Sequence, residues 1–340
     1  MHGRTNNGLY EWPVSHPQAH IISTSSPLTT WHQRLGHPHS RVLRFILNKF
    51  SLPFHERDKK FHCNSCLSNK AHRHPFTQLS LCSSKPLQII FSDLWGPSPV
   101  LSLDKKLYYC IFVDQYTKYT WLYTLTKKSE VKDIFQKFHP MMEKHFDSKI
   151  LSLYTDGRGE YKSLDSYLSL HGIQHLSTPA LAERQHRHIV ETARTLLHEA
   201  SLPPQFWSFA CHHTVYLINC LPTSHLDNQS PFQRLLRKSP NYNSLRIFGC
   251  LCYPWLKPYS KNKLESKSTP CVYLGFSLSH HCHQCFDPIS AKVYLSRDVR
   301  FVEDVFPFKT LFSNIAIKST HLEWQHQQCQ VLQTPHPNFP

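Results

Sequence analysis

Three acidic residues stand at points of the chain where their side chains could share divalent cations. Asp93 lies near the end of the apolar run "LQIIFSDLW", Asp156 follows the run "KILSLYT", and Glu183 heads the helical pattern "LAERQHRHIVETARTLL". Carboxylate oxygens are the ligands that magnesium and manganese prefer. Two such ions, about 4 Å apart, can bind the attacking and leaving oxygens of a phosphodiester. The three acids therefore indicate metal-dependent chemistry at phosphate, provided that their elements meet.

Each of these acids also has an ordinary structural explanation. Asp93 would cap a turn, Asp156 would lie in a polar loop, and Glu183 would be a favourable anion in the first turn of a helix. The metal interpretation requires the strands before Asp93 and Asp156 to be adjacent and parallel, so that both carboxylates project at one end of a sheet. Gly157 and Gly159 suit a sharp turn there.

Histidines and cysteines near the start of the chain have the spacing of metal ligands. His32 and His37 have four residues between them, and Cys63 and Cys66 have two. Two imidazoles and two thiolates complete a tetrahedral zinc site and leave no open position for catalysis, which predicts a structural zinc. The alternatives are scattered residues in a His-rich chain, or other nearby ligands: His39, His62, His72 and His74.

The composition favours a polyanionic partner. The 340 residues carry a formal charge of +15 at pH 7 and include 26 histidines. No apolar run has the length of a signal peptide or of a membrane span, so we expect an intracellular protein of the nucleus or cytoplasm that is not secreted and has no membrane partner. In that setting the 12 cysteines are expected to be reduced.

The order of elements predicts an α/β fold with a mixed sheet and flanking helices, preceded by a small helical zinc-binding module and followed by a small β-rich domain. The elements expected in the middle part are strands at 87–95, 107–114 and 120–125, a helix at 129–146, a strand at 149–156, a helix at 164–170, a strand at 173–176, and helices from about 180 and from 203. Further strands are expected at 245–253, 271–277, 291–296 and 299–308.

These patterns divide the chain into five parts. We expect a linker or weakly ordered arm at 1–30, the His2Cys2 zinc module at 31–76, the α/β core with trailing helices at 85–235, the β-rich module at 240–310 and a tail at 311–340. The run "HHCHQC" at 280–285 offers another set of metal-type ligands, but its place between two predicted strands favours a hairpin tip.

Eight motifs in fixed order resemble the integrase region of Copia-type LTR-retrotransposon Pol polyproteins. They are "WHQRLGHP…CNSC", "FSDLWGPSP", "TDGRGEY", "LAERQHRHIVETARTLL", "FWSFACHHTVYLINCLPT", "LRIFGCLCYP", "KSTPCVYLGFS" and "SRDVRFVEDVFPF". The resemblance covers residues 8–308. It implies a pre-integrase zinc module, a ribonuclease-H-like catalytic core and a C-terminal β-rich module.

The resemblance also implies an activity and its site. Such integrases trim the ends of the element's DNA and join the freed 3′ hydroxyl to target DNA, acting as multimers on paired DNA ends. By motif position Asp93, Asp156 and Glu183 match the catalytic triad that binds magnesium or manganese, and the His2Cys2 set matches the zinc ligands. Arg187, one turn after Glu183, would bind a DNA phosphate; the alternative is a surface ion pair with Glu183.

The chain departs from the family pattern near the predicted site. Only 26 residues separate Asp156 from Glu183; the family carries a longer segment, whose flexible loop is reduced here to Ala180. Loss of that loop is expected to shorten the helix start or to move Glu183 away from Asp93. Arg158 stands where the family usually has a small or polar residue; it would compete with a metal, or its side chain would point to solvent. No protease or reverse transcriptase motif flanks the match, as in a fragment.

The sequence leaves three hypotheses open for the function of the chain. The first is an active, metal-dependent polynucleotidyl transferase. The second is a catalytically silent remnant that still binds zinc and DNA, and it is favoured by the missing loop. The third is a zinc-dependent DNA-binding regulator, which leaves the ordered carboxylates unexplained.

Overall fold

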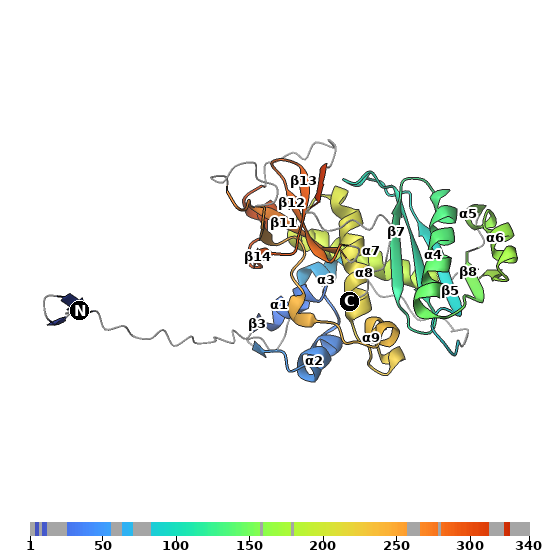
Figure 1. Cartoon of the computed structure of the whole chain (residues 1–340), viewed down its shortest axis with the longest axis horizontal. Helices are drawn as coiled ribbons and strands as arrows, with labels where there is room; N and C mark the ends of the chain where they lie inside the picture. Colours follow the sequence, from blue (N-terminus) through green and yellow to red (C-terminus); the bar gives the residue numbers. More distant parts are fainter. Residues whose placement is uncertain are drawn as a thin grey trace.

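The computed structural model describes residues 4–6, 9–11, 26–55, 63–70, 83–156, 159–177, 180–256, 266–277, 280–312 and 323–326. Figure 1 shows an α/β body on the right, a β-rich part at the upper left and a group of short helices below the β-rich part. Within the described residues, no helix combines the length and the apolar character needed to cross a membrane.

The N-terminal part contains two short strand pairs and three helices. Its elements are β1 (Arg4–Asn6), β2 (Leu9–Glu11), β3 (Ser26–Pro27), α1 (Leu28–Arg34), α2 (Ser40–Lys49), β4 (Phe54–His55) and α3 (Asn64–Asn69). Apolar side chains of α1 and α2, among them Trp31 and Ile46, form one core cluster with Leu217 and Tyr242 of the central body. The short helices therefore have no separate core and pack directly on the α/β body.

The central sheet has five strands in the order β7-β6-β5-β8-β9. Its strands are β5 (Ile89–Trp95), β6 (Tyr108–Asp114), β7 (Thr120–Leu125), β8 (Ser152–Thr155) and β9 (Gln174–Ser177). The first three pair antiparallel, whereas β8 pairs parallel to β5 and β9 parallel to β8. This mixed sheet with helices on both faces is the predicted ribonuclease-H-like arrangement, and each strand lies where the sequence pattern indicates.

Helices cover both faces of this sheet because its central strands are apolar on both sides. Along β6, Tyr109 and Ile111 point into one core and Cys110 and Phe112 into the other. The helices of this body are α4 (Glu130–Phe146), α5 (Gly159–Lys162), α6 (Asp165–Leu170), α7 (Ala180–Ala200), α8 (Trp207–Cys220) and α9 (Pro231–Leu236), with 3-10 turns η1 (Pro204–Phe206), η2 (Ser224–Leu226) and η3 (Tyr242–Ser244). In Figure 1, α4 lies on one side of the sheet and α7 and α8 on the other.

The C-terminal part is a sheet in the order β14-β10-β11-β12-β13-β15. Its elements are β10 (Leu251–Pro254), β11 (Cys271–Ser277), β12 (Cys282–Asp287), β13 (Lys292–Ser296), β14 (Val299–Val302), α10 (Pro307–Thr310) and β15 (Glu323–His326). Neighbouring strands are antiparallel except for β13 and β15. One face of this sheet joins the core that contains α7 and α8.

Three predictions for this sheet were wrong in detail. Residues 245–250 were expected in a strand, but β10 begins only at Leu251, because Gly249 takes a left-handed conformation (φ +79°) against Ala200. Residues 282–285 were expected at a hairpin tip and instead lie within β12. The strand expected at 299–308 ends at Val302 and is followed by α10.

Candidate functional site

The pairing of β5 with β8 places two of the predicted acids side by side. The parallel register pairs Ile89 with Ser152 and Phe91 with Tyr154. Continued by two residues, it puts Asp93 next to position 156. Asp93 is 8% exposed and Asp156, just beyond the end of β8, is half-buried. The sequence interpretation required this adjacency, and the described strands have it.

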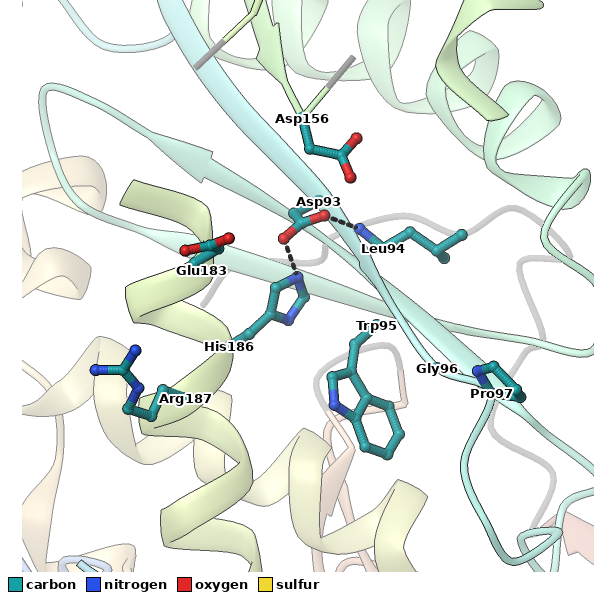
Figure 2. A pocket seen from close by; sticks show the side chains of 9 residues that line it. All are labelled: Asp93, Leu94, Trp95, Gly96, Pro97, Asp156, Glu183, His186 and Arg187. Carbon is teal, nitrogen blue, oxygen red and sulfur yellow. Dashed lines mark hydrogen bonds and ion pairs between the residues drawn. The ribbon is translucent and has the colours of Figure 1, made fainter. Parts of the chain in front are cut away.

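Helix α7 brings the third acid to the same place. Glu183, His186 and Arg187 lie three and four residues apart on this helix and therefore on one face. Together with Asp93 and Asp156 they line a pocket of about 460 Å³. Figure 2 shows the three carboxylates around this pocket, which we call the acidic pocket. Glu183 is exposed there, so its side chain has solvent on one side.

Asp93 has one hydrogen-bond donor and one close ring nitrogen among its neighbours. Its Oδ1 accepts a hydrogen bond of 2.8 Å from the backbone N–H of Leu94, and His186 Nε2 lies 3.2 Å from its Oδ2. The other ring nitrogen of His186, Nδ1, lies 3.1 Å from the hydroxyl of Tyr109 on β6. No expectation from the sequence included this contact of His186. Its position three residues after Glu183 was the available signal.

The shortened segment before Glu183 does not remove this acid from the pocket. α7 begins at Ala180, so Glu183 lies in its first turn and still lines the cavity with Asp93 and Asp156. The structure thus keeps Glu183 in the lining of this pocket, although the three acids do not come as close together as the His/Cys ligands, and the expected displacement of Glu183 away from Asp93 stays a prediction. Arg158, the predicted competitor for a metal, lies outside the described residues.

Arg187 is exposed at the edge of the acidic pocket. Among the described residues no ion pair joins it to Glu183, and Figure 2 draws no contact between the two side chains. The described residues thus give no support to an ion pair between Arg187 and Glu183. The Arg187 guanidinium is accessible to an anion at the rim of the acidic pocket.

The four predicted zinc ligands converge. One ligand atom from each of His32, His37, Cys63 and Cys66 lies within 4.8 Å of all the others. His37 Nδ1 is 3.2 Å from Cys63 Sγ, and His32 Nε2 is 3.3 Å from Cys66 Sγ. Edges of about 3.5 Å between nitrogen and sulfur follow from the bond lengths of a tetrahedral zinc site. The donor set and its spacing therefore fit one zinc ion.

The electrostatics of this His/Cys cluster suit a cation. The hydrogen bond with Cys66, supported by His32 and His37, holds the pKa of the Cys63 thiol far below its usual value and raises the pKa of Cys66, so one thiolate forms readily and a bound metal would have to displace the proton of the second. Burial lowers the pKa of His32 and so favours the neutral imidazole that binds metals. His37 is buried with φ near 60°. Gly36 before it is also left-handed, and a Cβ there would collide with Leu217 on α8.

Several polar contacts fix the His/Cys cluster to the rest of the molecule. Glu199, near the end of α7, accepts hydrogen bonds from Gln33 Nε2 at 2.8 Å and from Ser65 Oγ at 2.6 Å. Arg34 forms a two-pronged ion pair with Glu303 of the β-rich part, with both N···O distances 2.9 Å. Through these neighbours of its ligands, the His/Cys cluster is connected to the C-terminal end of α7, the helix that carries Glu183, and to the β-rich part.

Other candidate ligands do not form a comparable cluster. Among the described residues, only the His32, His37, Cys63 and Cys66 set brings three or more metal-type ligand atoms into such close range. His39 instead caps α2, where its ring accepts a hydrogen bond from the backbone of Arg41. His62, His72 and His74 lie outside the described residues. The three acidic side chains line one pocket but do not form such a close cluster.

Two family models match the ends of the chain. The GAG-pre-integrase domain matches residues 8–71, and the retroviral polymerase SH3-like domain matches residues 250–314. The ribonuclease-H-like body between them and its acidic pocket thus lie in the setting of an integrase-type region of a retrotransposon polyprotein.

Three plant proteins are similar over most of the chain. The retrovirus-related Pol polyprotein from transposon RE1 of Arabidopsis thaliana is 44% identical over 352 residues, covering 100% of this chain and 24% of that protein. The polyprotein from transposon RE2 of the same plant is 46% identical, covering 91% and 22%. That from transposon TNT 1-94 of Nicotiana tabacum is 33% identical, covering 80% and 21%.

The chain belongs to the retrovirus-related Pol polyproteins of transposons, and it spans about a quarter of the length of these curated relatives. The resemblance to the integrase region of Copia-type polyproteins is confirmed. Two solved structures have low similarity. The first is the HTLV-2 integrase catalytic core domain in complex with magnesium, with a TM-score of 0.35 and 18% identity; the match covers 45% of this chain and 99% of that one. The second is a simian T-cell lymphotropic virus intasome in complex with PP2A regulatory subunit B56 gamma, with a TM-score of 0.37 and 15% identity; the match covers 71% of this chain and 84% of that one. TM-scores this low carry no weight for the site.

Proposed function

We propose that the chain is a metal-dependent DNA integrase, which trims the 3′ ends of the element's DNA and joins them to target DNA inside the cell. The observation that carries this proposal is the acidic pocket. Asp93, Asp156 and Glu183 come from two strands and a helix that are far apart in sequence, and they line one cavity. Independent structural roles for three acids would not require them to meet.

The acidic pocket has the donor chemistry for magnesium or manganese. Hard carboxylate oxygens from three residues fit ions that keep part of their hydration shell, and a pocket of about 460 Å³ leaves room for the ions, water and a phosphate. When bound, such ions supply Lewis-acid activation of a phosphodiester and neutralise its developing charge. In this proposal Asp93, the more buried acid, anchors the ions, while the exposed Glu183 adjusts to them.

DNA binding follows from the charge of the chain and from the rim of the pocket. The formal charge of +15 favours a polyanion. Arg187, exposed at the rim, would bind a backbone phosphate next to the acids. The family works as multimers, so we include self-association on paired DNA ends in the proposal.

The His/Cys cluster is proposed to hold a structural zinc. Two neutral imidazoles and two thiolates complete four-coordination and leave no position for substrate. Within this proposal, residues 31–76 form the zinc module, 85–235 the catalytic core and 240–310 the β-rich module. The contacts of Glu199 and Glu303 described above would then hold the zinc module against the other two.

A specific feature favours a second candidate, an inactive remnant that retains zinc and DNA binding. The segment between Asp156 and Glu183 lacks the loop that the family places beside its site, and a loop there would help to order DNA. Both candidates have the same fold and bind zinc and DNA. They differ in whether the chain joins DNA strands.

A strand-transfer assay separates the two candidates. The chain is incubated with a labelled DNA end, target DNA and Mg²⁺ or Mn²⁺, beside the Glu183→Gln variant, which keeps the shape of the side chain and removes its charge. Joined product from the wild-type chain that falls at least 100-fold in the variant supports the integrase. If neither protein joins DNA but a chain with a restored family loop does, the chain is the remnant.

A further inference from the structure

We propose that His186 is a positioning residue for the acidic pocket, holding the Asp93 carboxylate in the orientation that receives a divalent cation. The inference rests on the proposed function, because it assigns a role to a residue that touches a proposed metal ligand. It goes beyond the triad, since neither His186, which lines the pocket beside Asp93, nor its partner Tyr109 is one of the three acids.

The surroundings of His186 leave its Nε2 one evident acceptor. The residue is 7% exposed, and within the described part of the chain Nε2 has no aligned hydrogen-bond partner. The Oδ2 atom of Asp93 lies 3.2 Å from it. A buried N–H without an acceptor is costly, so a small rotation of the ring or the carboxylate that aligns this contact is favoured. Figure 2 shows the ring edge facing Asp93.

Tyr109 determines which ring nitrogen of His186 carries the proton. Its hydroxyl lies 3.1 Å from Nδ1, and its ring contacts the imidazole at a centroid distance of 5.2 Å. Burial raises the pKa of Tyr109 well above its usual value, so the hydroxyl keeps its proton and can donate it in a hydrogen bond. With Nδ1 as the acceptor of this hydrogen bond, Nε2 carries a proton that faces Asp93.

In this arrangement both oxygens of the Asp93 carboxylate have a neighbouring N–H group. The backbone N–H of Leu94 donates to Oδ1 and His186 lies at Oδ2, so rotation of the Asp93 carboxylate is restricted. Each oxygen has a second lone pair for a cation. Residues that orient a metal ligand in this way typically change metal affinity by about 10- to 100-fold when removed.

Manganese binding measures this role without depending on catalysis. The full chain, with its His/Cys cluster first loaded with zinc, is titrated with Mn²⁺ while the electron paramagnetic resonance signal of free Mn²⁺ is recorded. Asp93→Asn defines the binding that belongs to the acidic pocket. His186→Leu is expected to weaken that binding about 10-fold. His186→Gln should restore it, because its amide nitrogen reaches the position of Nε2 and can donate.

Two further variants complete the design. Thr192→Val, a near-isosteric change at a buried position of the same helix, should leave Mn²⁺ affinity unchanged. Tyr109→Phe keeps the packing and removes the hydroxyl, so it should weaken Mn²⁺ binding even if His186→Leu does not fold.

The outcomes distinguish this inference from the proposed function. Equal Mn²⁺ binding by the wild type and Asp93→Asn would refute the proposed site itself. Wild-type binding that depends on Asp93 but is unchanged in His186→Leu would overturn the positioning role alone. A loss shared equally by the Leu and Gln variants would also overturn it, because that result indicates packing rather than donation.

Discussion

The stability of the chain should fall in mild acid because of one buried histidine, His213 on α8. It is 2% exposed, stacks on Phe248 at a centroid distance of 5.3 Å and lies edge-on to Tyr273. Within the described residues neither of its ring nitrogens has a hydrogen-bond partner. Burial lowers its pKa to about 3, so the folded protein holds this ring neutral.

The sign and size of the effect follow from proton uptake by the unfolded chain. Its pKa for this histidine is about 6.5, so below that pH the unfolded state binds a proton that the folded state does not. The free energy of unfolding therefore decreases as the pH falls from about 6.5 toward 3. Between pH 7 and pH 5 the loss from His213 alone is about 2 kcal/mol.

Urea unfolding at pH 7 and pH 5 measures this loss in the wild type, in His213→Leu and in a control, His225→Gln, at an exposed histidine. Other histidines and the His/Cys cluster contribute equally to all three proteins, so the difference between variants isolates one ring. We expect the pH-dependent loss to be about 2 kcal/mol smaller in His213→Leu and unchanged in the control. An identical loss in all three proteins would refute the assignment of a neutral, buried His213.

Two other predictions concern the His/Cys cluster and the sheet. The wild-type chain should bind one zinc ion, as measured by atomic emission, and Cys63→Ser should bind less, since a serine hydroxyl is a poor zinc ligand. An unchanged zinc stoichiometry would rule out this ligand set. Asp114→Ala should lower the free energy of unfolding by about 3 kcal/mol, because the buried carboxylate accepts hydrogen bonds from Leu87 N–H, Thr117 N–H and Thr117 Oγ1. Asp104→Ala, at a partly exposed acid, is the comparison for that denaturation experiment.

Much of the central body could be predicted because its local patterns agree with its tertiary structure. The strands are short apolar runs between turn residues, and α4 has helical spacing over its full length. The adjacency of Asp93 and Asp156 needed one assumption, that β5 and β8 are parallel neighbours, and this is the pairing observed.

The errors lie where tertiary contacts override the local pattern. The run before Leu251 looks like a strand because it is aromatic and branched, yet Ile247 and Phe248 are buried from a loop. Strand β12 was not predicted because its first residues belong to the His/Cys-rich run at 280–285. His283 within it packs between the rings of Tyr273 and Phe301, so the ring is used as an aromatic surface rather than as a polar group.

Contacts between distant segments could not be read from the sequence at all. Nothing in the spacing of His186 indicates Tyr109, 77 positions earlier, as its partner. The same is true of Glu199, which joins Ser65 and Gln33 across more than 130 positions. Such pairs depend on how helices dock on the sheet, and local propensity does not determine that docking.

The proposed metal site can be tested by locating manganese in crystals of the zinc-loaded chain by anomalous scattering. We predict at least one manganese peak within about 2.3 Å of carboxylate oxygens from both Asp93 and Asp156, with Glu183 turned toward the ions. A well-ordered pocket that contains no manganese at millimolar concentration, or ions bound without either aspartate, would contradict this prediction.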